Sequence, residues 1–130
     1  MAQISKILRN VEDNGLMFYC PGCKGLHMIR HGPGQGPRWG WNGNVDKPTF
    51  TPSILVHATK MTEQGRAAYN AWRDAGFPKL AFEQQFDNVP TVCHSFVTDG
   101  HIQFLGDCTH DLAGQTVYLP ELPEWARDDE

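Results

Sequence analysis

A mainly β, α+β domain is the fold class that this sequence predicts, and three observations predict it. Short apolar and β-branched runs recur along the chain and are separated by Gly- and Pro-rich turns. Only one stretch has the three- and four-residue apolar spacing of a helix. The length of 130 residues suits one domain with one core. We therefore expect a compact, sandwich-like β-sheet domain with a zinc knuckle and one inserted helix near residues 62–75.

The first predicted element is a β-hairpin with strands at residues 16–19 and 26–29. Its turn carries Cys20 and Cys23, and the Pro-Gly dipeptide between them lets the chain reverse sharply. Residues 31–37 contain three glycines and two prolines, so no regular element is expected there. The two cysteines are thus predicted to lie on a rigid turn that an irregular loop follows.

Strand structure is expected to resume after this loop. Trp39 and Trp41 alternate around a glycine, an Asn-Gly turn dipeptide follows, and residues 54–56 read as a short buried strand. Aromatic residues on strands usually belong to the core, so we assign both tryptophans to packing rather than to a stacking surface.

One helix interrupts the β pattern. Thr62 can cap its start, and Gly76 ends it. Residues 80–86 are expected to add a helical turn or two. We treat residues 60–90 as a helical insertion into the β domain.

Three more strands are predicted at residues 92–97, 101–105 and 115–119. Asp99 and Gly100 form a two-residue turn between the first two of these strands. The chain therefore returns to antiparallel sheet after the insertion.

Composition and charge limit the classes of function. The net charge of −4 and the scattered cationic residues exclude generic nucleic-acid binding. The start has no signal-peptide pattern and no run of 18 apolar residues occurs, so we expect a cytoplasmic protein with no membrane segment. In that compartment the cysteines are expected as reduced thiols or metal ligands. We assign residues 1–120 to a single domain and residues 121–130 to a loose acidic tail.

The four cysteines predict one zinc site. Cys20 and Cys23 have the spacing of a zinc knuckle. Cys93 begins one predicted strand and Cys108 follows the end of its partner, so pairing of these strands brings the two thiols to the same end of a hairpin. A closed site with four cysteine ligands is therefore expected.

Three histidines compete for a place near this site. His94 and His110 are alternative zinc ligands that compete for one position of the shell. Adjacent side chains on a strand point to opposite faces, so Cys93 and His94 are not expected to bind the same ion. We place His27 outside the shell, because it would have to point back from the outgoing strand.

The same residues leave the functional class open. We favour an accessory protein that acts by contact, with a host protein as its partner and zinc as a structural staple. The alternative is a zinc-dependent hydrolase in which His94, Asp107 or His110 is the general base. A third variant uses Cys108 as a nucleophile, although its thiolate is expected to be committed to metal.

Four segments carry a family pattern. They are Trp39-Gly40-Trp41-Asn42-Gly43, Pro48-Thr49-Phe50-Thr51-Pro52-Ser53, Cys93-His94-Ser95-Phe96-Val97 with Asp99-Gly100, and Asp107-Cys108-Thr109-His110-Asp111-Leu112-Ala113-Gly114-Gln115-Thr116-Val117. Together they resemble a family of small phage and prophage proteins of unknown function, sometimes labelled ammonia monooxygenase. The resemblance implies a phage origin and zinc binding but no activity. The oxygenase label does not fit, because that enzyme is a membrane copper protein and this chain has neither a membrane span nor a His-rich copper site.

Overall fold

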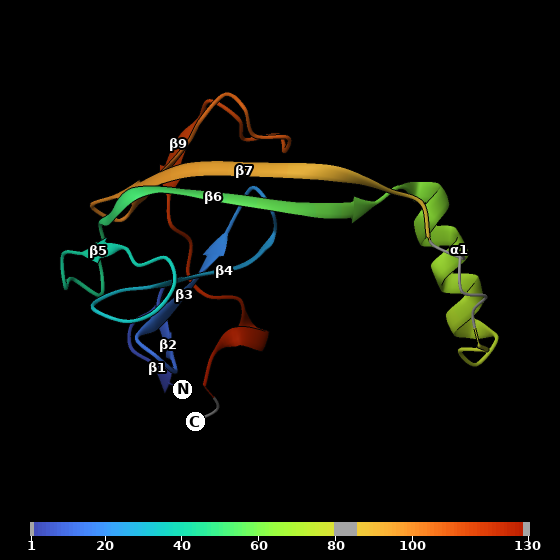
Figure 1. Cartoon of the computed structure of the whole chain (residues 1–130), viewed down its shortest axis with the longest axis horizontal. Helices are drawn as coiled ribbons and strands as arrows, with labels where there is room; N and C mark the ends of the chain where they lie inside the picture. The colour runs from blue at the N-terminus through green and yellow to red at the C-terminus, as the bar shows by residue number, and fades with distance from the viewer. Residues whose placement is uncertain (1, 80–85, 129–130) are drawn as a thin grey trace.

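Two antiparallel sheets form the body of the molecule in a computed structural model that describes residues 2–79 and 86–128 (Figure 1). The elements are β1 (Ala2–Gln3), β2 (Arg9–Val11), β3 (Gly15–Cys20), β4 (Gly25–Arg30), β5 (Gly40–Trp41), β6 (Phe50–Met61), α1 (Glu63–Asp74), β7 (Asn88–Thr98), β8 (His101–Phe104), β9 (Thr116–Tyr118) and a 3-10 turn (Glu124–Ala126). The first sheet has the order β1-β2-β3-β4 and the second β5-β6-β7-β8-β9. The predicted mainly β class is confirmed.

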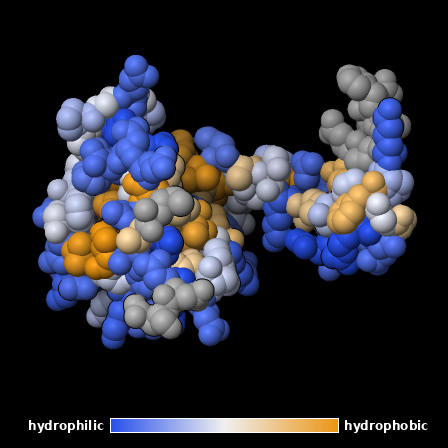
Figure 2. All heavy atoms as spheres, turned by 90° about the horizontal axis from the view of Figure 1, so that it is seen from below, coloured by the Kyte–Doolittle hydropathy of each residue, from blue (hydrophilic) through white to orange (hydrophobic). Residues whose placement is uncertain are grey.

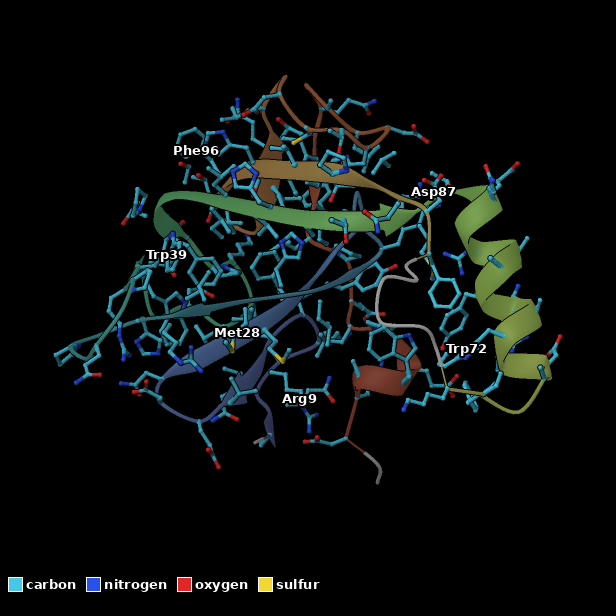
Figure 3. All side chains as sticks on the ribbon, turned by 45° about the vertical axis from the view of Figure 1, so that its right-hand side comes forward. Arg9, Met28, Trp39, Trp72, Asp87 and Phe96 are labelled. Carbon is cyan, nitrogen blue, oxygen red and sulfur yellow. The ribbon has the colours of Figure 1, made fainter. Side chains whose placement is uncertain are left out.

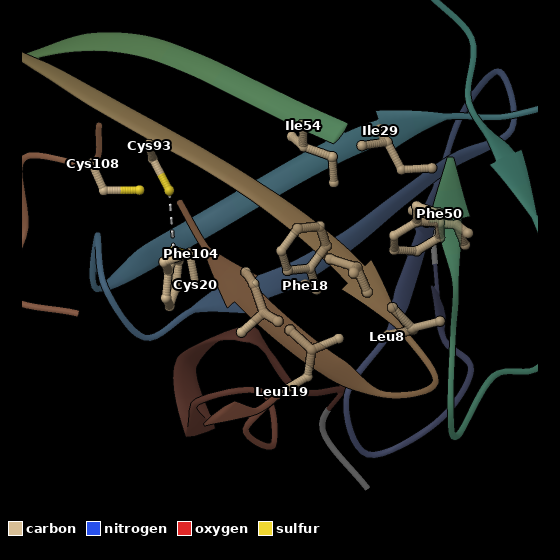
Figure 4. Packing of buried hydrophobic residues seen from close by; sticks show 13 residues of the cluster. Leu8, Phe18, Cys20, Ile29, Phe50, Ile54, Cys93, Phe104, Cys108 and Leu119 are labelled. Atoms are coloured by element: carbon tan, nitrogen blue, oxygen red, sulfur yellow. Dashed lines mark hydrogen bonds between the residues drawn. The ribbon is translucent and has the colours of Figure 1, made fainter. Parts of the chain in front are cut away.

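The core lies between the two sheets (Figure 4). Phe18 of β3 stacks on Phe50 of β6 with their ring centroids 6.0 Å apart, which joins the sheets at their centre. Ile29 of β4 and Ile54 of β6 are also buried there. Burying side chains of this size stabilises the fold by about 1.5–3 kcal/mol each.

Both predicted hairpins are present. In the first, Cys20 at the end of β3 pairs with Gly25 at the start of β4, so the cysteine turn lies at the hairpin tip. In the second, Asp99 and Gly100 join β7 to β8 with φ angles of 51° and 79°. Positive φ at both positions is the type I′ geometry that suits the twist of a hairpin.

The strands β6 and β7 are much longer than the sequence predicts. They pair without interruption from Ile54 opposite Ser95 to Met61 opposite Asn88. Their distal halves extend beyond the body and carry α1, which stands apart from it (Figures 1 and 2). The sequence did not predict the full length of β6, because the exposed residues of its distal part lack the apolar alternation of a strand packed on a core.

The helix begins and ends where predicted. The Oγ1 of Thr62 accepts a hydrogen bond of 3.0 Å from the Gly65 amide, which caps the first turn. Tyr69 and Trp72 pack against Phe86, with ring centroids 5.5 and 5.6 Å from it. The helical turn expected over residues 80–86 falls mostly outside the described residues.

The C-terminal segment is packed against the N-terminal strands up to residue 128, so the expected loose tail is wrong for this stretch. Leu122 is fully buried and its amide donates to the Lys6 carbonyl at 2.8 Å. Asp128 forms an ion pair with Arg9 and accepts from the Gln3 amide at 2.8 Å. The acidic composition did not predict this packing, because the packing depends on only two side chains, one buried leucine and one carboxylate with specific partners.

Across residues 2–79 and 86–128, no helix has the length and apolar character needed to cross a membrane.

Candidate functional site

The strand β7 separates two groups of polar side chains, one on each face of the second sheet. Cys93 and Ser95 point toward the core, with exposures of 2% and 0%. His94 lies between them and points outward, away from β3 and β4. Phe96 shares this outer side (Figure 3). Cys93 and His94 thus point to opposite faces of the sheet, as the sequence predicts.

On the outer face, three side chains form a continuous hydrogen-bonded chain. His94 Nε2 is 3.0 Å from Ser53 Oγ. Its Nδ1 is 3.1 Å from Asp107 Oδ2. When the carboxylate accepts from Nδ1–H, the lone pair of Nε2 faces the hydroxyl and can take its proton. The order and distances are those of a Ser-His-Asp triad.

An irregularity in β6 places Ser53. Phe50 pairs with Val97 and Ile54 pairs with Ser95, so four steps along β6 match two steps along β7. The extra residues form a bulge, and bulges commonly redirect a side chain beside an active site. Trp39 Nε1 also donates to the Ser53 carbonyl at 3.2 Å, which holds the bulge from the β5 side.

Backbone contacts of the loop after β8 place Asp107 beside His94. The Leu105 amide donates to the His94 carbonyl at 2.9 Å. Cys108 Sγ accepts from the His94 amide and donates to the His94 carbonyl, both at 3.2 Å. Thr109 N donates to the Val92 carbonyl at 2.9 Å. The loop is thus fixed to the segment of β7 that carries the histidine, and Asp107 is held there although its side chain is 55% exposed.

On the inner face, three thiols and a histidine converge. The ligand atoms of Cys20, Cys23, Cys93 and His27 all lie within 4.8 Å of one another. Cys20 Sγ and Cys93 Sγ are 3.9 Å apart, a contact drawn as a dashed line in Figure 4. Tetrahedral zinc with Zn–S bonds of about 2.3 Å requires S–S distances of about 3.8 Å. This group, which we call the thiol cluster, can hold a metal ion.

His27 belongs to the thiol cluster, whereas the sequence placed it outside the expected metal shell. Phe18 and His27 are register partners, and Cys20 lies two residues after Phe18 on the same inward face of the hairpin. The register therefore turns His27 inward without any distortion of β4. Its Nδ1 is buried and has no hydrogen-bond partner among the described residues. A buried imidazole with an unpartnered ring nitrogen, in a residue grouped with three thiols, is compatible with a role as a metal ligand.

His110 lies against the thiol cluster in a different role. Its Nδ1 accepts a hydrogen bond from the Leu112 amide at 3.2 Å, and its Nε2 is 3.5 Å from Cys93 Sγ. A neutral ring that accepts at Nδ1 carries its proton on Nε2. His110 is therefore arranged to donate to the Cys93 sulfur. The ring lies so close to Gly22 that a Cβ there would be 2.2 Å from His110 Cε1.

The three thiols differ in how readily they ionise. A hydrogen bond from Cys93 lowers the pKa of Cys20 to about 6. Burial, and then the charge on Cys20, raise the pKa of Cys23 to about 11. Donation to Cys20, followed by burial, also raises the pKa of Cys93. Burial lowers the pKa of His27, so its ring is neutral and able to ligate.

The structure sorts the site residues predicted from sequence into two sets. Cys20, Cys23 and Cys93 meet in the thiol cluster. Cys108 lies within 4.8 Å of Cys93 and His110 but is not grouped with the knuckle pair. His94 and Asp107 meet on the other face, as part of a triad rather than beside a metal.

Sequence reasoning missed Ser53. The serine lies 41 residues from His94 in the chain, and its reach depends on the bulge in β6. Its inclusion in one of the family segments is the only signal the sequence offered.

One comparison with known proteins identifies a family. The family model of the bacterial ubiquitination-like system serine protease (BubE) matches residues 2–105. The chain therefore belongs to this family. Ser53 and His94 lie inside the matched range, and Asp107 lies two residues beyond it. Neither curated proteins nor solved structures give a match. The phage origin expected from the resemblance stays a prediction.

Proposed function

We propose that this member of the BubE family is a serine protease in which Ser53 is the nucleophile, His94 the general base and Asp107 the residue that orients the base. The observation that carries the proposal is the unbroken contact chain of 3.0 Å from Ser53 to His94 and 3.1 Å from His94 to Asp107. It replaces the accessory-protein hypothesis and keeps part of the hydrolase alternative, since two of the predicted general bases retain a catalytic role.

The chemistry follows from the positions of these atoms. Ser53 Oγ attacks the carbonyl carbon of the scissile bond while His94 Nε2 takes its proton, and the tetrahedral intermediate then expels the leaving group, which receives that proton. Water enters along the same path, and His94 removes its proton as it attacks the acyl-enzyme. The second tetrahedral intermediate then breaks its bond to Ser53 Oγ, which takes the proton back from His94 as the acid product leaves. Asp107 keeps Nδ1 protonated throughout and stabilises the positive charge that develops on the ring.

The surroundings of the triad suit a polypeptide substrate. Leu55 is the cross-strand partner of His94 and is 49% exposed. Phe96, two residues along β7, is 41% exposed. These side chains flank the base on the outer face and offer apolar contact to the segment that reaches Ser53. The family description supports a substrate that belongs to a bacterial ubiquitination-like system.

We also propose that the metal of the thiol cluster is zinc, held by Cys20, Cys23, Cys93 and His27. Three thiolates and one imidazole are a common structural zinc shell, and softer ligands of this kind favour zinc over magnesium or calcium. The triad lies on the opposite face of β7, so zinc would stabilise the fold and contribute no group to the reaction. His110 would donate to the Cys93 thiolate and help orient it.

A hydrolysis assay with matched serine variants tests the proposed protease. Ser53→Ala removes the nucleophile. Ser95→Ala is the control, because its hydroxyl lies on the inner face next to His94 and has no hydrogen-bond partner among the described residues. We expect wild type and Ser95→Ala to hydrolyse p-nitrophenyl acetate and Ser53→Ala to lose the activity. Equal rates for Ser53→Ala and wild type would refute the assignment of the nucleophile.

A further inference from the structure

One edge of the second sheet is open along most of its length. In the sheet order, β6 lies between β5 and β7, but β5 pairs only Gly40 and Trp41 with Thr51 and Phe50. From Ile54 to Met61, β7 is the only strand paired with β6 among the described residues. Figure 1 shows β6 running past β5 toward α1 along this open side.

Contacts on β7 reveal which backbone groups of β6 face the open edge. The His94 amide and carbonyl bond to Cys108 and Leu105, on the β8 side. Backbone groups of successive strand residues point to opposite sides, so Cys93 and Ser95 direct theirs toward β6. Their partners Val56 and Ile54 therefore bond to β7.

The residues between these partners present unpaired groups. Leu55, His57 and Thr59 direct their amides and carbonyls to the open edge, and all three are exposed. Ser53 belongs to the same alternate series, and its carbonyl already bonds to Trp39 on that side. The series of free groups thus leads directly to the nucleophile.

We propose that the open edge of β6 binds an extended segment of the polypeptide substrate as an additional antiparallel strand. This inference rests on the proposed protease function and extends it to substrate recognition. Antiparallel pairing places the acyl side of the substrate along Thr59, His57 and Leu55 and brings the scissile carbonyl to Ser53. The seven residues of strand from Ser53 to Thr59 span about 20 Å.

The occupant is a substrate segment rather than a folded surface, for two reasons. The edge presents backbone amides and carbonyls at regular spacing, and such groups can pair with any extended chain. The edge also ends at a nucleophile, which a substrate strand must reach and which a second copy of this chain has no reason to approach. The apolar side chain of Leu55, on the strand that forms the edge, then contacts the bound strand.

The test compares two substitutions at one position. His57→Pro removes an amide that faces the open edge, and proline is tolerated at such an edge position because the ladder to β7 does not use that amide. His57→Ala removes the same side chain but keeps the amide. The substrates are p-nitrophenyl acetate and acetyl-peptide p-nitrophenyl esters of one, three and six residues. The measured quantity is the ratio of kcat/KM for each peptide ester to that for the acetate.

We expect this ratio to rise with peptide length in wild type and in His57→Ala, and to fall about fivefold in His57→Pro for the six-residue ester. A ratio that is independent of length, or equal in the two variants, would overturn strand addition. If wild type hydrolyses none of the esters, the proposed protease function is refuted instead. Hydrogen exchange of backbone amides in Ser53→Ala then tests whether the β6 edge binds a peptide strand.

In that measurement, the six-residue acetyl peptide amide is added to Ser53→Ala protein. Slower exchange of the Leu55, His57 and Thr59 amides supports strand addition. Unchanged exchange contradicts it. Slow exchange before the peptide is added, together with a dimer mass in sedimentation, would assign the edge to a second copy of the chain and also overturn the proposal.

Discussion

The two faces of β7 differ in every property that matters for chemistry, although Cys93 and His94 are neighbours in the chain. The inner face is buried and brings together three thiols and a histidine. The outer face is partly exposed and holds a hydrogen-bonded series of hydroxyl, imidazole and carboxylate. The two-residue period of a strand thus lets one segment contribute to the proposed metal site and to the proposed nucleophilic site without mixing their side chains.

The two faces remain connected through the backbone. Cys108 bonds to both the amide and the carbonyl of His94, while His110 reaches the Cys93 sulfur. The loop that carries Asp107 therefore lies between the triad and the thiol cluster. Substitutions on the inner face are expected to shift the loop that carries Asp107 and so to lower activity. Substitutions on the outer face should leave binding of the proposed metal unchanged.

The largest expected effect separates the two faces at adjacent residues. His94→Ala should lower kcat by about 10⁴-fold, because the base and the link to the carboxylate are both lost. Its metal content should equal that of wild type. Elemental analysis and p-nitrophenyl ester hydrolysis on the same preparation measure both quantities, and metal loss in this variant would show that His94 is a ligand.

Cys93→Ser should have the converse primary defect. Removing the one proposed ligand that β7 supplies should abolish stoichiometric metal binding and lower the melting temperature, since structural metal binding contributes to folding. Cys108→Ser is the matched control, because its sulfur contacts the His94 backbone rather than the knuckle. Equal metal loss in both variants would instead support the closed site of four cysteines.

The side chains that flank the triad should have a smaller effect. Phe96→Ala should raise KM for a peptide ester by roughly threefold to tenfold and change kcat little, because a half-exposed aromatic group contributes to binding and not to proton transfer. Val89→Ala, which removes a similarly exposed apolar side chain on the distal part of β7, is the control. Steady-state kinetics measure the effect, and a fall in kcat alone would place Phe96 in the catalytic step.

The smallest effect concerns the pH dependence of the metal-free protein. The lowered pKa of Cys20 contributes stability that is fully present above pH 9 and is lost as the pH falls toward 6. The raised pKa values of Cys23 and Cys93 contribute stability below pH 9 that is lost as the pH rises through about 11 and beyond. Urea unfolding of chelated protein should therefore give a maximum in the thiol contribution near pH 9. Metal-loaded protein should lack the alkaline decline, and an identical decline in both forms would mean that these thiols do not bind the metal.

Sequence patterns predicted the local elements well because their determinants are local. The Asp99-Gly100 turn, the Thr62 cap and the Cys20/Cys23 hairpin each depend on a few neighbouring residues. Alternation along β7 also separated Cys93 from His94. In contrast, Ser53 depends on a bulge and His27 on the β3–β4 register, and neither is encoded in the spacing of the residues themselves.

The central claim is that Ser53 is a nucleophile activated by His94, and covalent labelling tests it most directly. The protein is treated with a fluorophosphonate, which reacts with activated serines, and the modified peptide is located by mass spectrometry. We predict one adduct on Ser53 in wild type and in Ser95→Ala, and at least a hundredfold slower labelling in His94→Ala. An adduct on another residue, or equal labelling of Ser53 in wild type and His94→Ala, would contradict the account.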